Sequence, residues 1–559
     1  MRIFLRLAIL VFLVFSGARA AESLTAENLT ETARAQIGAY AREALKAVMD
    51  GRAAVAPADI AAAVTQAQGG AEVAVIRDGR LVASGHSLGG DSFLGNLRLA
   101  AGRAVFNFKV ADLDQCAVAV AALGEGKTAA VPAPVYKWAR GREAAVLENG
   151  GKSFYVGVFS PLLRQQDWES AVNETLKERL PNSDAKARLE FLTAPAAKLR
   201  VFPASLLVAA PGGKTTLLSG DEGAPARADA LKAAGAWWLA NQAPSGEYLA
   251  DYGPGADNTA AVPGNALAAA TFGMLWRQSG DKAYRLAGLK TLDWLLLNWF
   301  LEAPGTDYGY LTLADKTVNT GVNGVFLWAA ALLDVPEDDS ETARCRGKIE
   351  KFLLAQRQPD GFIRPWLQPA GSRKGMLENQ LWAVIGLMAR DAAKHAPAMS
   401  ASLAVARREF SQPGKAGLYA AMLSARAELA LYAATRQQEF SANAAAPYGR
   451  LLDDVRAGRV KIDTAYAAGE WACGLGQVAR AQKLLGAAAP LADKAEDFRA
   501  EQAAALRLLA GLQVIPGGGW AAILPGEKKY AGAFLPAFGE FTVDLPAMLC
   551  GTWALLEAE

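Results

Sequence analysis

The chain has 559 residues, of which 52% are hydrophobic, and its 58 lysines and arginines nearly balance its 56 aspartates and glutamates. This length predicts about two to four domains, and the hydrophobic content is ample for large cores. The neutral, interspersed charge argues against a nucleic-acid-binding protein, which needs a basic face, and against polybasic attachment to a membrane.

The first twenty residues have the pattern of a secretory signal peptide. Arg2 and Arg6 precede an apolar run at 7–15, and the segment ends in Ala18-Arg19-Ala20, the small-x-small pattern that signal peptidase recognises. The run is shorter than the roughly 20 apolar residues that span a bilayer. We therefore expect cleavage after Ala20, no remaining transmembrane anchor, and an exported, periplasmic protein. An uncleaved N-terminal anchor is the alternative.

Cysteine and histidine are scarce, and no Cys-x-x-Cys pair occurs. Scattered cysteines in apolar helices indicate buried thiols, with disulfides in an oxidising compartment as the alternative. Two distant histidines argue against a zinc site or a serine–histidine triad, so we expect no metal and no cofactor. His395, in Ala-Lys-His-Ala-Pro, is typical of a solvated helix end. The four cysteines are Cys116, Cys345, Cys473 and Cys550.

Residues 21–210 alternate short β-type runs with helical stretches, which predicts an α+β domain. Gly-containing turns at Asp78-Gly79 and Gly150-Gly151 separate apolar runs, as is typical of β-hairpins. The expected strands are 71–76, 81–84, 142–147 and 153–158, and the expected helices are 25–49, 91–104 and 167–180.

This order of elements, over roughly residues 25–205, resembles the AMMECR family, a small α+β domain of poorly defined function. Ser160–Glu169 is similar to the family's Leu-Pro-x-Val…Trp-Asp segment, and Lys198–Phe202 is similar to its closing strand. The family's most recognisable motif is Leu-Arg-Gly-Cys-Ile-Gly. Its place is taken here by Leu81–His86, without the Arg and the Cys. The resemblance therefore implies a fold and no activity.

Proline and glycine cluster at 211–226, which predicts an exposed linker. From 227 to 559 strand signals nearly vanish and helix-period apolar stripes recur, which predicts an all-α domain of helical hairpins. The expected helices lie near 228–241, 264–279, 282–299, 320–334, 340–357, 377–393, 398–410, 415–436, 445–457, 463–474, 477–486, 492–512 and 544–557.

An internal echo supports this array, because Trp238–Gly246 matches Leu353–Gly361 and both segments end a helix at Pro-(Ser/Asp)-Gly. The pattern resembles an α/α-toroid, the architecture of glycoside hydrolases, polysaccharide lyases, uronyl epimerases and terpenoid cyclases. Gly264–Tyr284 is similar to the sugar-acting kind, and the acid motifs of the cyclases are absent. A toroid hosts unrelated chemistries, so its function must be argued from the site.

Acidic and aromatic residues gather in loops directly after predicted helix breaks, where a toroid places its site. Carboxylates can act as acid and base, aromatic faces stack on sugar rings, and arginine pairs with a uronate. We predict Asp251 and Asp307 as the acid/base pair, with Glu378 in reserve. Packing of the toroid rim is the alternative role for the aromatic residues. The predicted substrate-binding residues are Tyr248, Tyr252, Tyr308, Tyr310, Arg364 and Trp366.

The starts of the predicted inner helices carry a second set of polar residues, for each of which an N-cap is the favoured interpretation. Glu470, Trp471 and Glu540 are weaker site candidates. The cap positions are Asn265, Asn319, Glu378-Asn379, Asp463-Thr464 and Asp544.

The sequence thus predicts an exported cell-envelope protein whose toroid binds and processes a neutral or acidic glycan, as a hydrolase, lyase or epimerase. A non-catalytic binding or scaffold protein that uses the same region is the alternative. Acids converging among aromatic residues would favour the enzyme.

Overall fold

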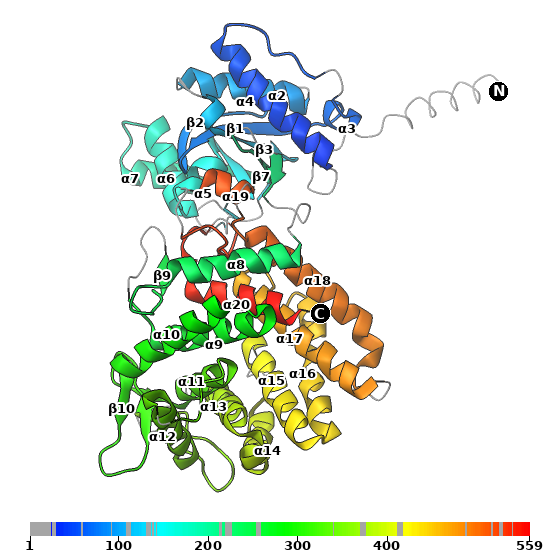
Figure 1. The fold of residues 1–559 in the computed structure, drawn as a ribbon. Helices are drawn as coiled ribbons and strands as arrows, with labels where there is room; N and C mark the ends of the chain where they lie inside the picture. Colours follow the sequence, from blue (N-terminus) through cyan, green and yellow to red (C-terminus); the bar gives the residue numbers. More distant parts are fainter. Residues whose placement is uncertain are drawn as a thin grey trace, which may run out of the picture. The chain divides into compact units, whose positions relative to one another are not determined.

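A computed structural model divides into two compact units, Met1–Gly223 with Val514–Glu527, and Ala224–Gln513 with Lys528–Glu559 (Figure 1). The predicted signal peptide lies outside the described residues. The structure describes residues 24, 29–57, 60–90, 92–107, 113–129, 136, 139–140, 142–211, 215–218, 226–252, 259–338, 340–368, 376–410, 417–486, 489–515, 518–524, 529–538 and 540–558.

The first unit (unit 1) is built on an antiparallel sheet in the order β2-β1-β3-β7-β5-β6, with β4 and β8 also paired to β7. The long strand β7 pairs with β5 through its first half and with β3 through its second half, so it joins two halves of the sheet. The strands are β1 (Gly70–Arg77), β2 (Arg80–Ser87), β3 (Ala117–Leu123), β4 (Lys127–Thr128), β5 (Glu143–Asn149), β6 (Lys152–Val156), β7 (Lys198–Ala209) and β8 (Thr215–Leu217).

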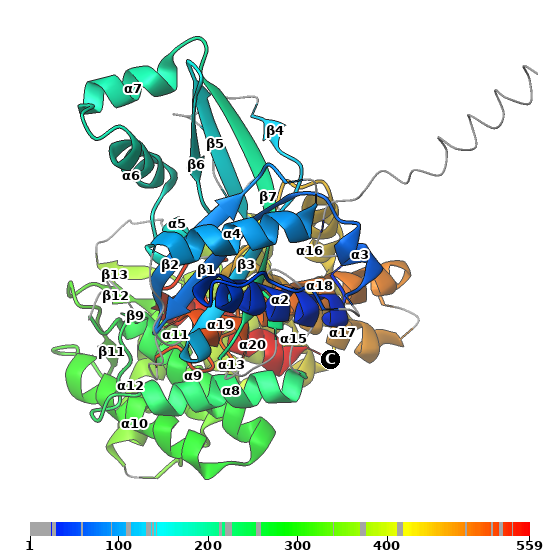
Figure 2. The same ribbon diagram turned by 90° about the horizontal axis from the view of Figure 1, so that it is seen from above.

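Each half of this sheet has its own helices and its own core (Figure 2). Helix α2 (Glu31–Met49) buries Ala33, Ile37, Ala41 and Ala44, a helix-period stripe, and packs with α4 (Phe93–Asn107) against the β1–β3 half. Helix α6 (Trp168–Arg179) packs on β6. The remaining helices of unit 1 are α3 (Ala62–Thr65), α5 (Phe159–Leu163), α7 (Ala185–Thr193) and α19 (Gly519–Ile523).

Two features of unit 1 differ from the domain boundaries expected from the sequence. Part of the expected linker is strand β8, in which Thr215 and Leu217 are buried. The segment Val514–Glu527, placed by the sequence in the helical domain, belongs to unit 1. Its helix α19 packs on β7 and β8, and Gly519 lies so close that an added Cβ would be 2.5 Å from Leu218.

The second unit (unit 2) is an α/α-toroid, as predicted from the sequence. In the described part of this unit, six inner helices pack in succession and the last one, α20, returns to the first, α9, so the ring closes. The inner helices are α9 (Val262–Ser279), α11 (Thr320–Leu332), α13 (Met376–Arg390), α15 (Leu418–Thr435), α17 (Ala465–Leu485) and α20 (Leu545–Glu557).

Each inner helix also packs against an outer helix, and α20 closes the circle by pairing with α8. Inner and outer helices alternate along the chain, so the inner helices run parallel. We call the end where they begin the amino end of the ring and the opposite end the carboxyl end. The outer helices are α8 (Arg227–Asn241), α10 (Lys282–Trp299), α12 (Glu341–Ala355), α14 (Ala392–Phe410), α16 (Gln438–Arg456) and α18 (Ala495–Leu512).

Helix α17 corrects the prediction of two helices at 463–474 and 477–486. Gly474 and Gly476 favour a break by propensity, yet the helix is continuous. An added Cβ would lie 2.1 Å from the Tyr448 hydroxyl at Gly474 and 2.3 Å from the Glu557 carbonyl oxygen at Gly476. These glycines therefore allow close helix packing and do not mark a turn.

The predicted internal echo corresponds to one repeated turn. Gly246 donates its N–H to the Ala243 carbonyl, and Gly361 donates to Gln358 in the same way. Both glycines have positive φ, and an added Cβ would meet the backbone of the next outer helix, at Lys290 and at Ala401. The echo thus marks where the ends of α8 and α12 meet α10 and α14.

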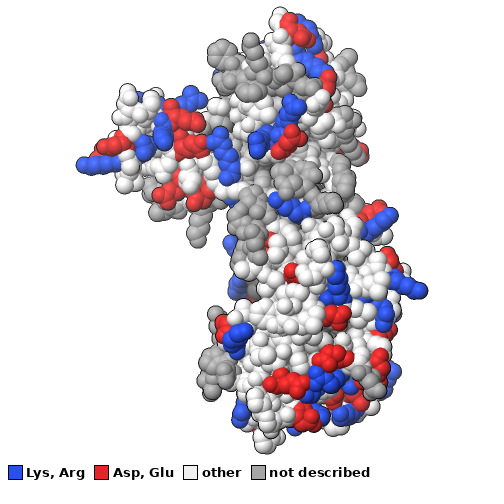
Figure 3. Space-filling model, turned by 60° about the vertical axis from the view of Figure 1, so that its left-hand side comes forward, with Lys and Arg blue, Asp and Glu red and all other residues white. Residues whose placement is uncertain are grey.

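None of the four cysteines, all of them described residues, forms a disulfide, and three of them are buried. The expectation of a solvated His395 is wrong: its side chain is 3% exposed and its Nε2 lies 3.0 Å from Glu350 Oε1, because this face of α14 packs inward. On the face shown in Figure 3, basic and acidic side chains are intermixed on both units. Within the described residues, no helix is long and apolar enough to cross a membrane.

Candidate functional site

Short β-pairs precede two of the inner helices at the amino end of the ring. Strand β9 (Asp251–Tyr252) pairs with β14 (Val543–Asp544), which places Asp251 directly opposite Asp544. Strand β12 (Val318–Asn319) pairs with β13 (Trp366–Gln368) and places Trp366 opposite Asn319. Because α20 and α11 begin immediately after Asp544 and Asn319, these pairs fix two acids and a tryptophan at this end.

Asp544 both caps a helix and carries a perturbed carboxyl group. Its Oδ1 accepts a hydrogen bond from Ala547 N at 2.7 Å, as an N-cap does. Burial raises the pKa of Asp544 to about 6, and the negative charge of Asp251 adds to the rise, although the Ala547 N–H opposes it. Asp544 therefore changes its protonation state near neutral pH.

Glu470 is a second acid at this end, in the second turn of α17, whose N-cap is Thr464. Burial raises the pKa of Glu470 to about 7. Within the part of the chain that the structure describes, no hydrogen bond or ion pair to its carboxyl group is found. A largely buried carboxyl group without a partner is costly to ionise, so Glu470 holds its proton up to neutral pH.

Side chains from three other inner helices lie near Glu470. Trp382 of α13 donates its Nε1–H to the hydroxyl of Tyr419 on α15 at 2.9 Å. Burial raises the pKa of Tyr419 and of Cys550 on α20, and the charge of Glu470 adds to both shifts. The backbones of α17 and α20 meet at Gly469, where an added Cβ would lie 2.5 Å from the Cys550 carbonyl oxygen. Asp544 also raises the pKa of Cys550, so both acids act on one region.

Three predicted site residues lie on β9 or just before it, and two of them are structural. Tyr248 is fully buried and its hydroxyl donates to the Trp238 carbonyl, so it has no surface for a sugar. Tyr252 accepts the Leu249 N–H at 3.0 Å and packs its ring on Trp237. Only Asp251 keeps a carboxylate free to act.

The predicted pairing of Asp251 with Asp307 is not what the structure shows. Asp307 lies on the hairpin between β10 (Phe300–Glu302) and β11 (Gly309–Leu311), its side chain is 79% exposed, and it is ion-paired with Lys351 of outer helix α12. That hydrogen-bonded lysine lowers the pKa of Asp307. Tyr308 and Tyr310 pack around Phe352 of α12, with ring centroids 5.9 and 5.2 Å away.

The other predicted residues either lie at the amino end of the ring or make structural contacts. Trp366, described above, and Glu378, in the first turn of α13, lie at the amino end and are partly exposed. Arg364 is exposed on the connection that follows outer helix α12, where its N–H donates to the Gln356 carbonyl. Asn265 is buried and holds Tyr248 through both backbone atoms.

Nothing in this arrangement points to a metal centre. Within the described residues, no group of three or more histidine, cysteine, aspartate or glutamate side chains is placed to hold a metal ion. The chemistry at the amino end would be that of its carboxyl groups, Glu470, Asp544 and Asp251, beside the phenol of Tyr419.

No model of a known protein family matches this chain, and no curated protein matches it. An uncharacterized protein from Pyrococcus horikoshii is similar over 33% of this chain and 96% of its own, at 17% identity and a TM-score of 0.29. An inactive variant of an alpha-1,6-mannanase from Salegentibacter sp., in complex with alpha-1,6-mannotriose, is similar over 59% and 98%, at 10% identity and 0.45. An unsaturated glucuronyl hydrolase from Bacillus sp. GL1 is similar over 59% and 96%, at 12% identity and 0.41. Likenesses this weak assign neither a family nor an activity to this chain.

Proposed function

We propose that unit 2 of this exported protein binds a glycan at the amino end of the ring and hydrolyses a glycosidic bond there. The observation that carries the proposal is Glu470, a largely buried carboxyl group with no partner among the described residues and a pKa of about 7. A group that keeps its proton at neutral pH is suited to protonate a leaving oxygen. The signal-peptide pattern of residues 1–20 supports export.

The second carboxyl role falls to Asp544 and Asp251. Glycoside hydrolysis uses one protonated acid and one carboxylate that acts as base or nucleophile. Asp251 and Asp544 are Cα partners on adjacent strands, and the charge of Asp251 adds to the rise in the pKa of Asp544. This pair supplies the carboxylate, and Glu470 supplies the proton.

Aromatic side chains at the same end provide the surface on which a sugar ring stacks. Trp366 and Tyr419 are both partly exposed there. The hydroxyl of Tyr419 is held by Trp382, which fixes the phenol ring beside Glu470. Aromatic faces against sugar C–H groups bind neutral and acidic glycans alike, so the class of glycan is left to the experiment.

The test is turnover of a library of neutral and uronate-containing oligosaccharides by the full chain. Glu470→Gln and Asp544→Asn should each lower the rate by roughly 10²–10⁴-fold, the range for a positioned acid or base. Glu496→Gln is the matched control, since Glu496 is 85% exposed on outer helix α18 and should leave the rate unchanged. Absence of turnover on every oligosaccharide would contradict hydrolysis, and binding that all variants share would indicate a non-catalytic role.

A further inference from the structure

Unit 1 contains a cavity of about 890 Å³, apart from the acids of unit 2. Its walls come from β1, β2, β6, α2, α4, α5 and α6 and from the chain next to α2 and α5. The volume falls in the range of sites for small molecules, roughly 300–1,000 Å³. Its lining is unusual because it combines a buried acid, a histidine and several arginines.

Glu72 lines the cavity, and its carboxyl group is already hydrogen-bonded within the protein. Glu72 is 3% exposed, and its Oε2 accepts hydrogen bonds from the Tyr155 hydroxyl and from Val158 N, both at 2.7 Å. Its Oε1 accepts from Phe159 N at 3.3 Å. An added Cβ at Gly157 would lie 2.8 Å from Oε1, so glycine is needed for this close approach. Glu72 thus orders the wall and has little left to offer a ligand.

A stacked pair of rings forms the next part of the wall. His86 on β2 is the register partner of Glu72, and its ring lies 3.7 Å from that of Tyr155 at an interplanar angle of 17°. Burial, together with the charges of Arg103 and Arg179, lowers the pKa of His86 to about 4. The His86 imidazole is therefore neutral at physiological pH, and it lies close to the positive charges of Arg103 and Arg179.

The mouth of the cavity carries more positive than negative charge. Five arginines line the cavity against three glutamates. Glu43 pairs with Arg52, and Glu174 pairs with Arg164, whereas within the described residues Arg98 and Arg179 have no such partner. The lining arginines are Arg52, Arg98, Arg103, Arg164 and Arg179, and the glutamates are Glu72, Glu174 and Glu178.

Apolar side chains share the same mouth. Val48 and Leu99 are 37% and 45% exposed, which is high for residues of this kind, and both line the cavity together with Leu81 and Pro161. Exposed apolar surface beside free arginines matches a ligand with an apolar or ring-shaped body and an anionic group. A bare inorganic ion would leave this surface unused.

We propose that the cavity of unit 1 binds a small organic anion. Its carboxylate or phosphate group pairs with Arg103 and Arg179, and its body lies against Leu81, Leu99 and the His86 ring. Arginine suits either group because its planar fork donates two parallel hydrogen bonds to paired oxygens. This site is independent of the glycan proposed for unit 2.

The experiment is calorimetric titration of the full chain with four probes: phenyl phosphate, benzoate, inorganic phosphate and benzyl alcohol. The organic anions should bind, inorganic phosphate at least tenfold more weakly, and the neutral alcohol not at all. Preference for phenyl phosphate or benzoate tells which anionic group the site prefers. Failure of both organic anions to bind at millimolar concentration would overturn the proposal, as would equal binding of inorganic phosphate.

Variants locate the site. Arg179→Gln should weaken phenyl phosphate binding at least tenfold. The Arg179 side chain is exposed and has no ion-pair partner among the described residues, so its replacement should leave folding unchanged. Leu99→Ala should weaken phenyl phosphate and leave inorganic phosphate unchanged. Arg80→Gln is the control, because Arg80 is exposed on the same strand as His86 but does not line the cavity. Glu470→Gln in unit 2 should also leave binding unchanged. Equal affinity in Arg179→Gln and Arg80→Gln would refute the assignment.

Discussion

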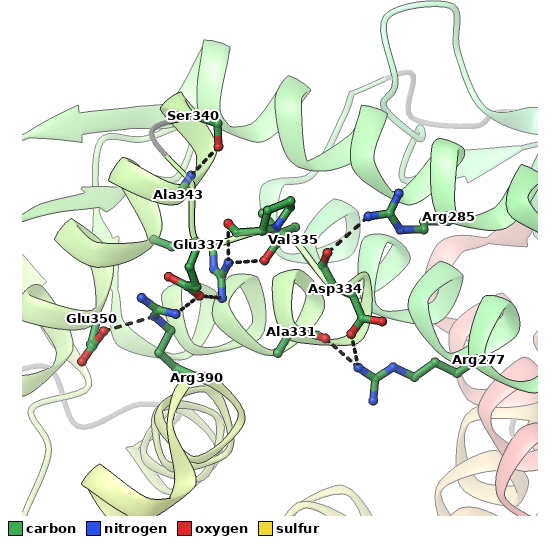
Figure 4. Close-up of polar contacts among 12 residues, drawn as sticks. Arg277, Arg285, Ala331, Asp334, Val335, Glu337, Ser340, Ala343, Glu350 and Arg390 are labelled. Atoms are coloured by element: carbon green, nitrogen blue, oxygen red, sulfur yellow. Dashed lines mark hydrogen bonds and ion pairs between the residues drawn. The ribbon is translucent and has the colours of Figure 1, made fainter.

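The two ends of the inner ring differ in how their charged side chains are paired. At the carboxyl end, Arg277 donates to the Ala331 carbonyl at 2.8 Å and pairs with Asp334 at 2.7 Å, while Arg285 donates to the Asp334 carbonyl at 3.2 Å (Figure 4). These groups surround the last turn of α11. At the amino end, Glu470 has no comparable partner among the described residues.

Helix geometry explains the carboxyl end. The last four carbonyls of a helix lack partners within it and carry partial negative charge, so arginines there are stabilising. A second layer adds to this network: Arg390, the last residue of α13, pairs with Glu337 and with Glu350 (Figure 4). Hydrogen bonding from His395 and the charge of Lys394 lower the pKa of Glu350 to about 2.

Under the proposed function, the charged groups that stabilise the ring and those that react lie at opposite ends of it. Charges at the carboxyl end are satisfied by backbone and by one another, and the pKa of Glu350 falls. Acids at the amino end are buried without such partners, and the pKa values of Glu470 and Asp544 rise. Raised values of this kind are typical of functional sites, where they are retained at the expense of stability.

The largest expected effect on stability is at the carboxyl end. Glu350→Gln should lower the free energy of unfolding at pH 7 by about 3 kcal/mol, the equivalent of a pKa lowered from 4.5 to about 2. Because the folded-state pKa is depressed, this contribution is present above pH 4.5 and is lost as pH falls toward 2. Denaturant unfolding of variant and wild type at several pH values measures it. A difference that stays constant across this window would contradict the account.

The amino end should show the opposite sign. Glu470→Gln should raise the free energy of unfolding by on the order of 2 kcal/mol at pH 8, because the folded-state pKa of about 7 makes ionisation costly. At pH 4 wild type and variant should be equal, since the carboxyl group is protonated in both folded and unfolded chains. The same unfolding series measures this, and a destabilised variant at pH 8 would show that Glu470 has a structural partner.

A smaller loss is expected from the arginine that caps α11. Arg277→Ala should lower the free energy of unfolding by about 1–2 kcal/mol, since the Ala331 and Leu332 carbonyls lose their donor. Turnover per folded molecule should not change, because the residue lies at the carboxyl end. Arg480→Ala is the control: Arg480 is exposed on α17 near the same end and should have almost no effect in the same thermal and kinetic assays.

Two substitutions at Asp544 separate its role as an N-cap from its proposed role in turnover. Asp544→Ala should be about 1 kcal/mol less stable than Asp544→Asn, because only asparagine keeps a side-chain oxygen that accepts the hydrogen bond from Ala547 N. Both variants should lose turnover. Thermal unfolding and rate measured on the same samples distinguish the roles, and equal stability of the two variants would argue against the cap.

The smallest effect is expected at Asp307, the acid that the sequence favoured. Its exposed ion pair with Lys351 faces solvent, where such pairs contribute little. Asp307→Asn should change neither the melting temperature nor turnover. A large loss of turnover would restore Asp307 to the site and would contradict the division of charge between the two ends.

The toroid could be predicted from sequence because helix-period stripes and the Pro-x-Gly turns are local signals. The site could not be predicted from sequence, because Asp307 and Asp251 follow similar helix breaks. Only the fold shows that Asp307 faces the outer helix α12. Glu470 did carry a signal, since it interrupts the apolar run from Ala465 to Cys473 on α17. The importance of Glu470 is visible only in the fold, where α17 is an inner helix of the ring. The cavity of unit 1 has no local signal, because its arginines are scattered from Arg52 to Arg179.

The segment Val514–Glu527 has a consequence for biosynthesis. The chain leaves unit 2 after α18, contributes α19 to unit 1, and returns to make α20, the helix that closes the ring against α8 and α9. During synthesis, the strands β1–β8 therefore leave the ribosome long before α19, the helix that packs on β7 and β8. Leu218 and its contact residue Gly519 are separated by some three hundred residues of chain. The last segment of unit 1 ends at Glu527 and the last segment of unit 2 ends at Glu559. Their last parts are made within one short stretch of chain, so the two units should reach their final structures together.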